Sequence, residues 1–449
     1  MSCSKSGVAA VAMLLQLALC APRCMAQSGT LLTLNEAIAQ ALSQNRPIRA
    51  ASLDVANYDD RIVQNRTKAL PSFRFEAESG LLLQRLDFIF ERGVFGSFPG
   101  IGPVPSQNTS ITTPIRLTAV MFGQIAEPLS QHYKIRLGTR QLQLGKQIAQ
   151  EQLRAKRQSL TQSVKQLYYS MLETQSGISD LEEDVKLYRE LERHTSVYFQ
   201  QEAVLKSDLL QVRAKLAQTE YDLVIQQNNL ATQKAQMNAL LARDVRTAFE
   251  VMPVPEDLPP DLDLRGLEAR ALAARPEVLQ ARLQLQQAEV ARKLAKADSI
   301  PDVSATINDV SLLNYGKIVP SNIATAGFTV TWEPFDWGRR KREVSEKQRG
   351  VEQATLAEKE TESQVLVDLD DKFRRLAQFR QALKVARVGQ ESAQENVRIT
   401  TKRYEQQASL LKDVLQSQAQ LADVNHHYRQ ALLAFWNAKA ELEKAMGEE

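Results

Sequence analysis

Histidines are the side chains in this sequence whose type most readily supports metal binding or proton transfer. The four histidines are His132, His194 and the adjacent pair His426 and His427. Adjacent side chains on a helix point about 100° apart, so the pair does not face one metal ion together. The sequence also lacks a glycine-rich phosphate loop. We therefore expect no metal site, no cofactor and no enzyme activity.

Charged side chains give little sign of a catalytic or nucleic-acid site. Asp368, Asp370 and Asp371 form a dense acidic group, which we interpret as a solvated or tunnel-facing patch rather than a catalytic carboxylate pair. The formal net charge is +3 at pH 7, and two of the cations, Lys5 and Arg23, lie in a segment that we expect to be removed. The mature chain would be nearly neutral, so we expect no nucleic-acid partner.

Residues 1–26 have the features of a secretory signal peptide. Lys5 precedes an apolar run from Val8 to Leu19, and small residues at Cys24 and Ala26 predict cleavage after Ala26. The run is too short for a membrane span. The alternatives are a buried N-terminal helix, or a lipoprotein cleaved before Cys20, although the preceding leucine is too large for that cleavage site.

All three cysteines, Cys3, Cys20 and Cys24, lie in this segment. A mature chain without thiols has no disulfide, no cysteine nucleophile and no thiolate metal site. No later stretch contains about 18 consecutive apolar residues, so we expect no transmembrane helix. An exported protein of this kind is either soluble or crosses a membrane as a β-barrel.

The rest of the chain consists of two sequence repeats of one structural unit. Phe199–Thr219 aligns with Tyr404–Val424, and Leu32–Ala77 aligns with Leu262–Ile307. Each copy predicts a short helix, a strand, a loop, a strand, a long helix, a turn and a helix. We predict a first repeat over 27–250, a Pro-rich linker over 251–261 and a second repeat over 262–447.

Apolar residues at alternating steps of three and four predict long helices. The pattern is clearest from Leu153 to Tyr188 and weaker from Leu366 to Leu383. By itself it indicates only an ordinary coiled coil. We predict helices over about 31–70, 129–200 and 208–243 in the first repeat, and over about 263–299, 335–405 and 412–447 in the second.

Between these helices the apolar period changes from about 3.6 to 2, which is typical of strands. We predict strands over about 72–83, 114–125, 302–313 and 323–333. Their apolar faces favour contact with lipid, and the alternative is a soluble antiparallel sheet with one buried face. The predicted lipid-facing residues are Ile115, Leu117, Phe328, Val330 and Trp332, and Trp332 clusters with Phe335 and Trp337 like an interfacial girdle.

Four strands cannot close into a barrel, because closed barrels begin at about eight strands. Open edges are not tolerated in lipid. Two copies would leave little lumen, whereas three copies would supply twelve strands around an open channel. The Gly- and Pro-rich loop over 84–113 is longer than its counterpart over 314–321, so we expect it on the cell exterior.

The order of these motifs resembles the TolC family of outer-membrane efflux proteins. The resemblance rests on LTLNEAIAQALSQNRPI with LPSFRFEA, on the turn WEPFDWGRRKREV, and on the paired AVLKSDLLQVRAKL and ASLLKDVLQSQAQL. MNALLARD and AKAELEKAMGE close the two repeats. The resemblance implies a mainly α fold with a β-barrel part. In it, three copies form a twelve-stranded barrel in the outer membrane of a Gram-negative bacterium and an α-helical tunnel in the periplasm.

The resemblance also implies partners for the doubled stretch. In the family it is a helix–turn–helix tip that docks on a periplasmic adaptor protein, which connects it to an inner-membrane transporter of the RND or ABC type. Leu205 and Leu410 are apolar at exposed turns, as docking residues would be, although they could simply pack the turn. The implied docking residues are Ala203, Val204, Leu205, Ser207, Asp208, Ala408, Ser409, Leu410, Lys412 and Asp413.

Two features depart from the family pattern. Glu202 and Gln407 stand where many relatives have glycine, so the turn has no residue that adopts positive φ freely. The family often narrows its tunnel with an acidic ring, whereas this stretch reads NVRITTKRY and predicts a basic or Gln-lined constriction. The candidate constriction residues are Glu391, Glu395, Arg398 and Lys402.

Three functions remain open from the sequence. The first is a passive export duct for small molecules in a tripartite efflux system, with energy supplied by the inner-membrane partner. The second is the same duct in a type I polypeptide secretion system. The third, from a different class, is a soluble periplasmic coiled-coil scaffold.

Overall fold

The computed structural model of the chain describes residues 30–448, except 203–204, 255–263, 315–319, 407 and 410. The predicted signal peptide and its three cysteines, with the lipidation candidate Cys20, lie outside the described residues, as does most of the predicted linker. Three of the predicted docking residues, Ala203, Val204 and Leu410, also lie outside them.

Two compact units make up the chain, and they do not follow the repeats. Unit 1 comprises Met1–Arg46, Arg157–Leu264 and Asp370–Glu449, and unit 2 comprises Pro47–Lys156 and Arg265–Leu369. Each repeat contributes to both units, because the helices α4 (His132–Gln200) and α8 (Arg339–Glu405) each supply residues to both.

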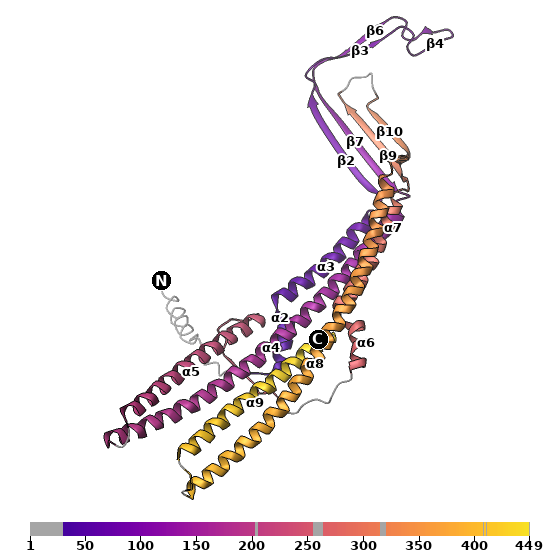
Figure 1. The fold of residues 1–449 in the computed structure, drawn as a ribbon. Helices are drawn as coiled ribbons and strands as arrows, with labels where there is room; N and C mark the ends of the chain where they lie inside the picture. The colour runs from indigo at the N-terminus through magenta and orange to yellow at the C-terminus, as the bar shows by residue number, and fades with distance from the viewer. Residues whose placement is uncertain are drawn as a thin grey trace, which may run out of the picture. The chain divides into compact units, whose positions relative to one another are not determined.

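Unit 2 contains a four-stranded sheet, which Figure 1 shows as a group of adjacent arrows. Its strands are β2 (Ser72–Leu81), β7 (Leu117–Pro128), β9 (Asp302–Leu313) and β10 (Asn322–Thr331). They lie in the order β10-β9-β7-β2, and every neighbouring pair is antiparallel. The pairing of β7 with β9 joins the first repeat to the second.

The strand that we expected over 114–125 lies three residues further along the chain. Pro114 lacks the N–H that a strand partner would accept, which explains why β7 begins only at Leu117. The expected loop over 84–113 contains paired strands: β3 (Leu86–Phe90) with β6 (Thr109–Thr113), and β4 (Ser97–Phe98) with β5 (Gly102–Pro103). Figure 1 shows these strands extending beyond the end of the four-stranded sheet.

The helices before the strands are broken where single helices were expected. The expected helix over 31–70 is a short strand β1 (Thr30–Leu32) followed by α2 (Leu34–Gln44) and α3 (Arg46–Thr67). The expected helix over 263–299 is α6 (Leu264–Ala274) followed by α7 (Pro276–Ala297). Proline explains the second break: Arg275 takes an extended conformation before Pro276, which then occupies the first turn of α7. Asn45 is extended in the same way one residue before Arg46-Pro47.

Unit 1 holds the helices α5 (Lys206–Leu240) and α9 (Leu411–Ala445), parts of α4 and α8, and a parallel pair of β1 with β8 (Phe249–Val251). The buried ring of Tyr168 on α4 anchors this pair. Its hydroxyl accepts a hydrogen bond from the Met252 amide at 2.9 Å and donates to the Leu32 carbonyl at 2.9 Å. Burial also raises the pKa of Tyr168. One side chain therefore ties the start of the first repeat to its end.

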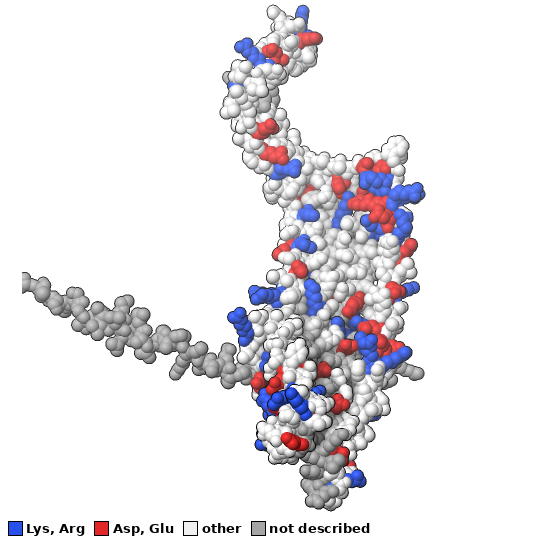
Figure 2. Space-filling view, turned by 60° about the vertical axis from the view of Figure 1, so that its left-hand side comes forward, with Lys and Arg blue, Asp and Glu red and all other residues white. Residues whose placement is uncertain are grey.

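Charged residues of both signs are mixed over the surface. Figure 2 shows Lys and Arg interspersed with Asp and Glu over the face that it displays. None of the helices in the described part of the chain is both long and apolar enough to cross a membrane.

Candidate functional site

The register of the four strands places their apolar residues on one face of the sheet. Ile125 of β7 pairs with Phe73 of β2 and with Ile307 of β9, and Ile307 in turn pairs with Ala326 of β10. Because side chains alternate along a strand, the odd-numbered residues of β2, β7 and β9 share a face with the even-numbered residues of β10. The apolar face contains Phe73, Phe75, Ala77, Met121, Ile125, Val303, Ala305, Ile307, Ala326, Phe328 and Val330.

This apolar face is largely uncovered in the single chain. Phe73, Phe75 and Phe328 are 78%, 71% and 75% exposed. Asp309 is a charged exception on this face, and its carboxylate accepts hydrogen bonds from Asn322 at 2.8 Å and from the Ser311 hydroxyl at 3.2 Å. A large exposed apolar surface is uncommon on a soluble monomer and marks a surface that contacts something else.

The opposite face of the sheet is polar and hydrogen-bonded across strands near the helices, and further from them it carries Val120, Phe122, Val310, Leu312 and Ile323. The amide of Gln124 on β7 donates to Asn308 of β9 at 2.9 Å, and the hydroxyls of Thr306 and Thr329 lie 3.3 Å apart. Near the helices the two faces therefore differ in the way that the alternating patterns predicted.

The five predicted lipid-facing residues are all exposed, at the positions that the register gives them. Leu117 pairs with Leu81, and Phe328 and Val330 lie on the apolar side of β10. Ile115 precedes β7 and Trp332 follows β10, so these two lie just outside the strands. Their contact with lipid remains a prediction.

Aromatic residues gather where β10 leads into α8. The rings of Phe335 and Trp337 meet edge to face with centroids 4.8 Å apart, and both are exposed, as is Trp332. Aromatic rings exposed at one end of a strand are typical of a membrane interface.

Both outer strands of the sheet have a free edge within the described residues. β10 pairs only with β9, and β2 pairs only with β7. Along the order of the sheet the strands alternate in direction, so β2 and β10 run antiparallel to each other. The two free edges can therefore pair with each other on neighbouring copies in the same antiparallel pattern.

The turn between α4 and α5 is built by residues of the first doubled stretch. Glu202 adopts a φ of 57°, so the position without glycine nevertheless takes the left-handed conformation. Leu205 caps α5 and is 70% exposed, and its amide donates to the Asp208 carboxylate at 3.2 Å. The acidic residue stabilises the free N–H group at the start of α5, where the helix dipole also favours it. Ser207 donates from its hydroxyl to the same carboxylate at 3.4 Å.

The turn between α8 and α9 is the second doubled stretch. The amide of Ala408 donates to the Arg403 carbonyl at 2.8 Å, and the Ser409 hydroxyl donates to the Thr400 carbonyl at 3.4 Å. Lys412 and Asp413 lie in the first turn of α9. The structure thus places the described docking candidates at two helical turns, and their contact with an adaptor remains a prediction.

The candidate constriction residues form a stripe on α8, spaced four, three and four residues apart. Arg398 donates from its Nε to Glu395 at 2.6 Å, and Glu391 lies 3.7 Å from Arg387. The hydrogen bond from Arg398 lowers the pKa of Glu395 below its ordinary value and raises that of Arg398. Lys402 continues the stripe and is exposed. Whether this stripe narrows a channel remains a prediction.

The acidic group over 368–371 is more closely paired than a solvated patch. Asp368 contacts the buried Arg275 at 2.8 Å, while its own side chain is 40% exposed. Asp370 and Asp371 each pair with an arginine four residues further along α8, as exposed helical charges do. Sequence patterns could not reveal the Arg275 contact, because it joins residues that are far apart in the chain.

The histidines lie beside single carboxylates. His426 Nδ1 is 3.8 Å from Asp180, and His427 Nε2 is 3.6 Å from Asp423. Among the described residues, no three His, Cys, Asp or Glu side chains are grouped so that they could hold a metal ion.

Comparison with known proteins finds a family match over part of the chain. Residues 267–448 match the outer membrane efflux protein family. No curated protein matches the chain closely enough to be recognised as a relative.

Solved structures match nearly the whole chain. CusC, described in terms of transmembrane channel formation, has a TM-score of 0.73 at 16% identity, covering 93% of this chain and 92% of that chain. The CmeC outer membrane channel of Campylobacter jejuni has a TM-score of 0.72 at 18% identity, over 92% of this chain and 85% of that one. The outer membrane protein VceC of Vibrio cholerae has a TM-score of 0.71 at 14% identity, over 92% of this chain and 96% of that one.

At these identities the solved structures establish the fold, and the family match covers the second repeat. The predicted fold class, two tandem repeats of long helices with a β part, is confirmed. The predicted resemblance is confirmed as well: residues 267–448 match the outer membrane efflux protein family, and the chain has the fold of outer-membrane channels.

Proposed function

We propose that this protein is the outer-membrane channel of a tripartite efflux system in a Gram-negative bacterium. It is a passive duct that a periplasmic adaptor joins to an inner-membrane pump and through which small molecules leave the cell. The observation that carries the proposal is the sheet of unit 2, with one exposed apolar face, polar side chains hydrogen-bonded across strands on the other face, and two free edges.

The free edges support a ring of several copies. Unpaired N–H and C=O groups are not tolerated in lipid, so β2 of one copy must pair with β10 of the next. Three copies supply twelve strands, which leave a water-filled lumen, whereas two supply eight, which side chains fill. The apolar face would then contact lipid and the hydrogen-bonded polar face would line the lumen.

The two helical turns support an adaptor contact. Each presents exposed side chains at the start of a returning helix, among them Leu205, and a ring of three copies would present six such turns. Because we expect no nucleotide or metal chemistry from the sequence, energy for export would come from an RND-type or ABC-type transporter.

Cysteine pairs on the two free edges test the ring directly. The partners are Glu76→Cys on β2 and, in separate variants, Thr325→Cys, Thr329→Cys or Thr331→Cys on β10. Their side chains share the polar face. We expect one combination to form covalent trimers in non-reducing gels, because only one register brings the two strands together.

Cysteines at Gln124 and Asn308 provide the matched control. These residues pair within one chain, so they should cross-link without any oligomer ladder. Sucrose-gradient fractionation should place the protein with the outer membrane. A monomer that stays in solution without detergent would instead indicate the soluble periplasmic scaffold.

The exported substrate separates the two duct functions. Deletion of the gene should raise the sensitivity of the cell to small toxic compounds if the duct serves efflux. Unchanged sensitivity, together with loss of a secreted polypeptide from the medium, would favour the type I secretion system instead.

A further inference from the structure

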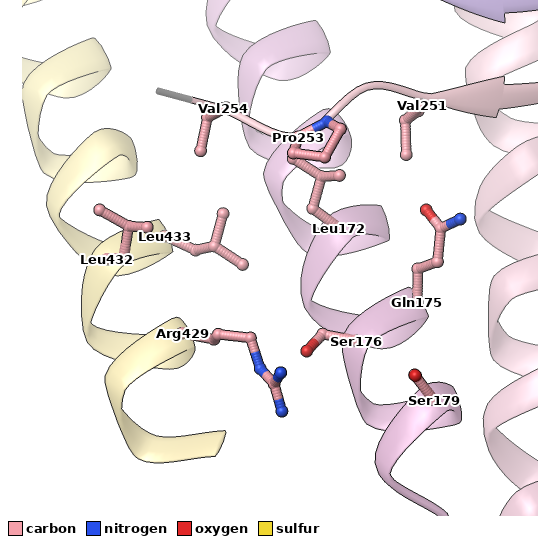
Figure 3. Close-up of a pocket in the computed structure, with 10 residues that line it drawn as sticks. All are labelled: Leu172, Gln175, Ser176, Ser179, Val251, Pro253, Val254, Arg429, Leu432 and Leu433. Atoms are coloured by element: carbon pink, nitrogen blue, oxygen red, sulfur yellow. The ribbon is translucent and has the colours of Figure 1, made fainter. Parts of the chain in front are cut away.

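Unit 1 and unit 2 each contain a pocket, and the two pockets differ in the charge that they hold. The pocket of unit 1, about 520 Å³ between α4, α9 and the segment after β8, is mostly aliphatic. Figure 3 shows Leu432 and Leu433 on α9, Leu172 on α4 and the side chain of Arg429 extending toward α4. Arg429 is the charged residue of this lining, and it already binds Asp180. The described lining therefore offers no free charge that would select a ligand.

The pocket of unit 2 is cationic. It has a volume of about 620 Å³ and lies between the end of α3 and the start of α4. Its lining includes Arg66 of α3 and Arg136 of α4, together with the polar side chains of His132, Thr139 and Gln143. The volume is within the range of small-molecule sites, which is about 300–1,000 Å³. Two guanidinium groups on one pocket favour an anion, and their planar donors match the oxygens of a phosphate.

The protein itself does not neutralise these two arginines. Within the described residues, the guanidinium groups of Arg66 and Arg136 form no ion pair, and both side chains are exposed. Glu127, a carboxylate near the pocket, lies 4.0 Å from His132. Lys134 of α4 contacts Asp302 at 2.8 Å and is not part of the lining. The pocket therefore keeps two accessible positive charges.

The sequence on both sides of the pocket is basic. Residues 61–75 contain four Lys or Arg side chains and no Asp or Glu, and residues 128–150 contain another four and no Asp or Glu. Clusters of Lys and Arg beside a membrane-spanning segment are typical of contact with anionic lipid headgroups.

The second repeat shows that this excess of cations is not a requirement of the fold. Residues 126–140 align with residues 332–346. At the start of α8, Arg339 contacts Glu333 at 2.7 Å and Arg340 contacts Asp336 at 3.7 Å, so carboxylates neutralise the cations there. Three acidic residues of this segment have no acidic counterpart in the first repeat: Asp336, Glu343 and Glu346 align with Ser130, Leu137 and Arg140. The free cations are therefore a feature of the first repeat alone.

The pocket lies where the strands join the helices. Arg66 is in the last turn of α3, shortly before β2, and His132 is the first residue of α4, shortly after β7. In the proposed channel the strands cross the bilayer, so this junction lies at the headgroups of the periplasmic leaflet. The exposed aromatic rings of Phe335 and Trp337 occupy the equivalent junction of the second repeat, as is typical of a membrane interface.

We propose that this pocket binds the phosphate of an anionic phospholipid such as phosphatidylglycerol, an inference that rests on the proposed outer-membrane location. The phosphate accepts charge-assisted hydrogen bonds from Arg66 and Arg136, which are strong. The acyl chains extend into the bilayer past Leu70 and Leu129, which lie between the helices and the strands and are both exposed. A bound lipid thereby ties α3 to α4 at the point where each helix meets its strand.

Native mass spectrometry of the full-length protein in detergent tests this site. The probes are phosphatidylglycerol, phosphatidylcholine, whose headgroup has no net charge, and diacylglycerol, which lacks the phosphate. We expect the protein to retain phosphatidylglycerol, to retain phosphatidylcholine more weakly and to lose diacylglycerol. Excess glycerol 3-phosphate, a soluble phosphate without acyl chains, should not displace the lipid.

Three variants separate the pocket from general attraction of anionic lipid to a basic surface. Arg66→Gln and Arg136→Gln should each lower the affinity for phosphatidylglycerol by about tenfold, the effect of losing one charge-assisted hydrogen bond. Arg342→Gln is the matched control, because Arg342 aligns with Arg136, is exposed at the start of α8 and does not line the pocket. It makes the same change of charge and should leave the affinity unchanged.

Unchanged affinity in both pocket variants, or an equal loss of affinity in Arg342→Gln, would overturn the proposal. Equal retention of diacylglycerol would show that the phosphate is not recognised, and displacement by glycerol 3-phosphate would assign the pocket to a soluble phosphate instead of a lipid. The same spectra report the oligomeric state. A trimer that fails to retain the lipid contradicts this inference alone, whereas a monomer that dissolves without detergent contradicts the proposed channel.

Discussion

Tyr168 concentrates several interactions in one hydroxyl group. That group binds backbone atoms of Leu32 and Met252, which lie 136 and 84 residues away in the sequence. The predicted heptad stripe ran through Leu167 and did not include Tyr168. In the structure the hydroxyl of Tyr168 holds β1 and β8 against α4.

Tyr168→Phe should therefore destabilise the protein without changing its fold. The substitution removes the hydroxyl that binds the Met252 amide, which keeps a longer hydrogen bond to the Leu32 carbonyl at 3.4 Å, and the loss of one such hydrogen bond costs about 0.5–1.5 kcal/mol. Thermal unfolding followed by circular dichroism measures the change. Tyr221→Phe, at a side chain that is 62% exposed, is the control and should have almost no effect. Equal effects of the two variants would contradict the anchoring role.

Glu202 holds a conformation that suits glycine better. Its φ of 57° is costly for a residue with a side chain, by about 1–2 kcal/mol. We predict that Glu202→Gly protects the amides of the α4–α5 turn from hydrogen exchange. Gln201→Gly, at the neighbouring position, should have the opposite effect, because glycine there adds only flexibility. Reduced protection in both variants would show that the positive φ is not strained.

Glu395 should titrate below the ordinary range of a glutamate. Its lowered pKa comes first from the hydrogen bond with Arg398. A depressed carboxylate pKa means that the ion pair is present above the ordinary pKa and is lost as the pH falls through the lower folded value. Titration followed by carbon NMR should show this depression, and Arg398→Gln should remove it. An unchanged titration in Arg398→Gln would assign the depression to another group.

At the scale of elements, the strands and their faces were predictable, and their pairing was not. Alternation along β9 needs only neighbouring residues, so its bounds over 302–313 match the structure. The order β10-β9-β7-β2 depends on contacts between residues almost 200 positions apart. The β3–β6 pair was missed because glycines and prolines dominate the loop around two short strands.

The two faces of β10 should respond oppositely to charge. Phe328→Arg places a cation on the apolar face, which costs about 2–4 kcal/mol near the middle of a bilayer. Thr329→Arg places the same cation on the polar face. We expect the first variant to be missing from the outer-membrane fraction and the second to assemble normally, as measured by immunoblotting of fractions. Normal assembly of both variants would mean that the apolar face is not in lipid.

At the scale of the whole molecule, the repeats are not independent. Contacts between them occur inside both units: β7 pairs with β9 in unit 2, and Lys165 contacts Glu443 at 2.6 Å in unit 1. The duplication in the sequence predicted two similar halves. It could not indicate that compact units would form from parts of both, because that depends on where each long helix finds its neighbours.

Separately expressed repeats, 27–250 and 262–447, should therefore be unfolded alone. Each would lose the strand and helix partners that the other supplies. Limited proteolysis should degrade either repeat by itself, and co-expression should restore a resistant complex that purifies together. A protease-resistant single repeat would show that one half contains a sufficient core.

The two unpaired margins of the sheet have a consequence for biogenesis. In a single subunit the outer strands carry unpaired backbone N–H and C=O groups beside an exposed apolar face. Such strands can pair with any extended polypeptide that they contact. In the proposed assembly, a subunit would avoid such contacts before the ring closes only by fast assembly or with the help of a chaperone. If delivery to the membrane were slow, the same unpaired strands that would assemble the proposed channel would instead promote aggregation.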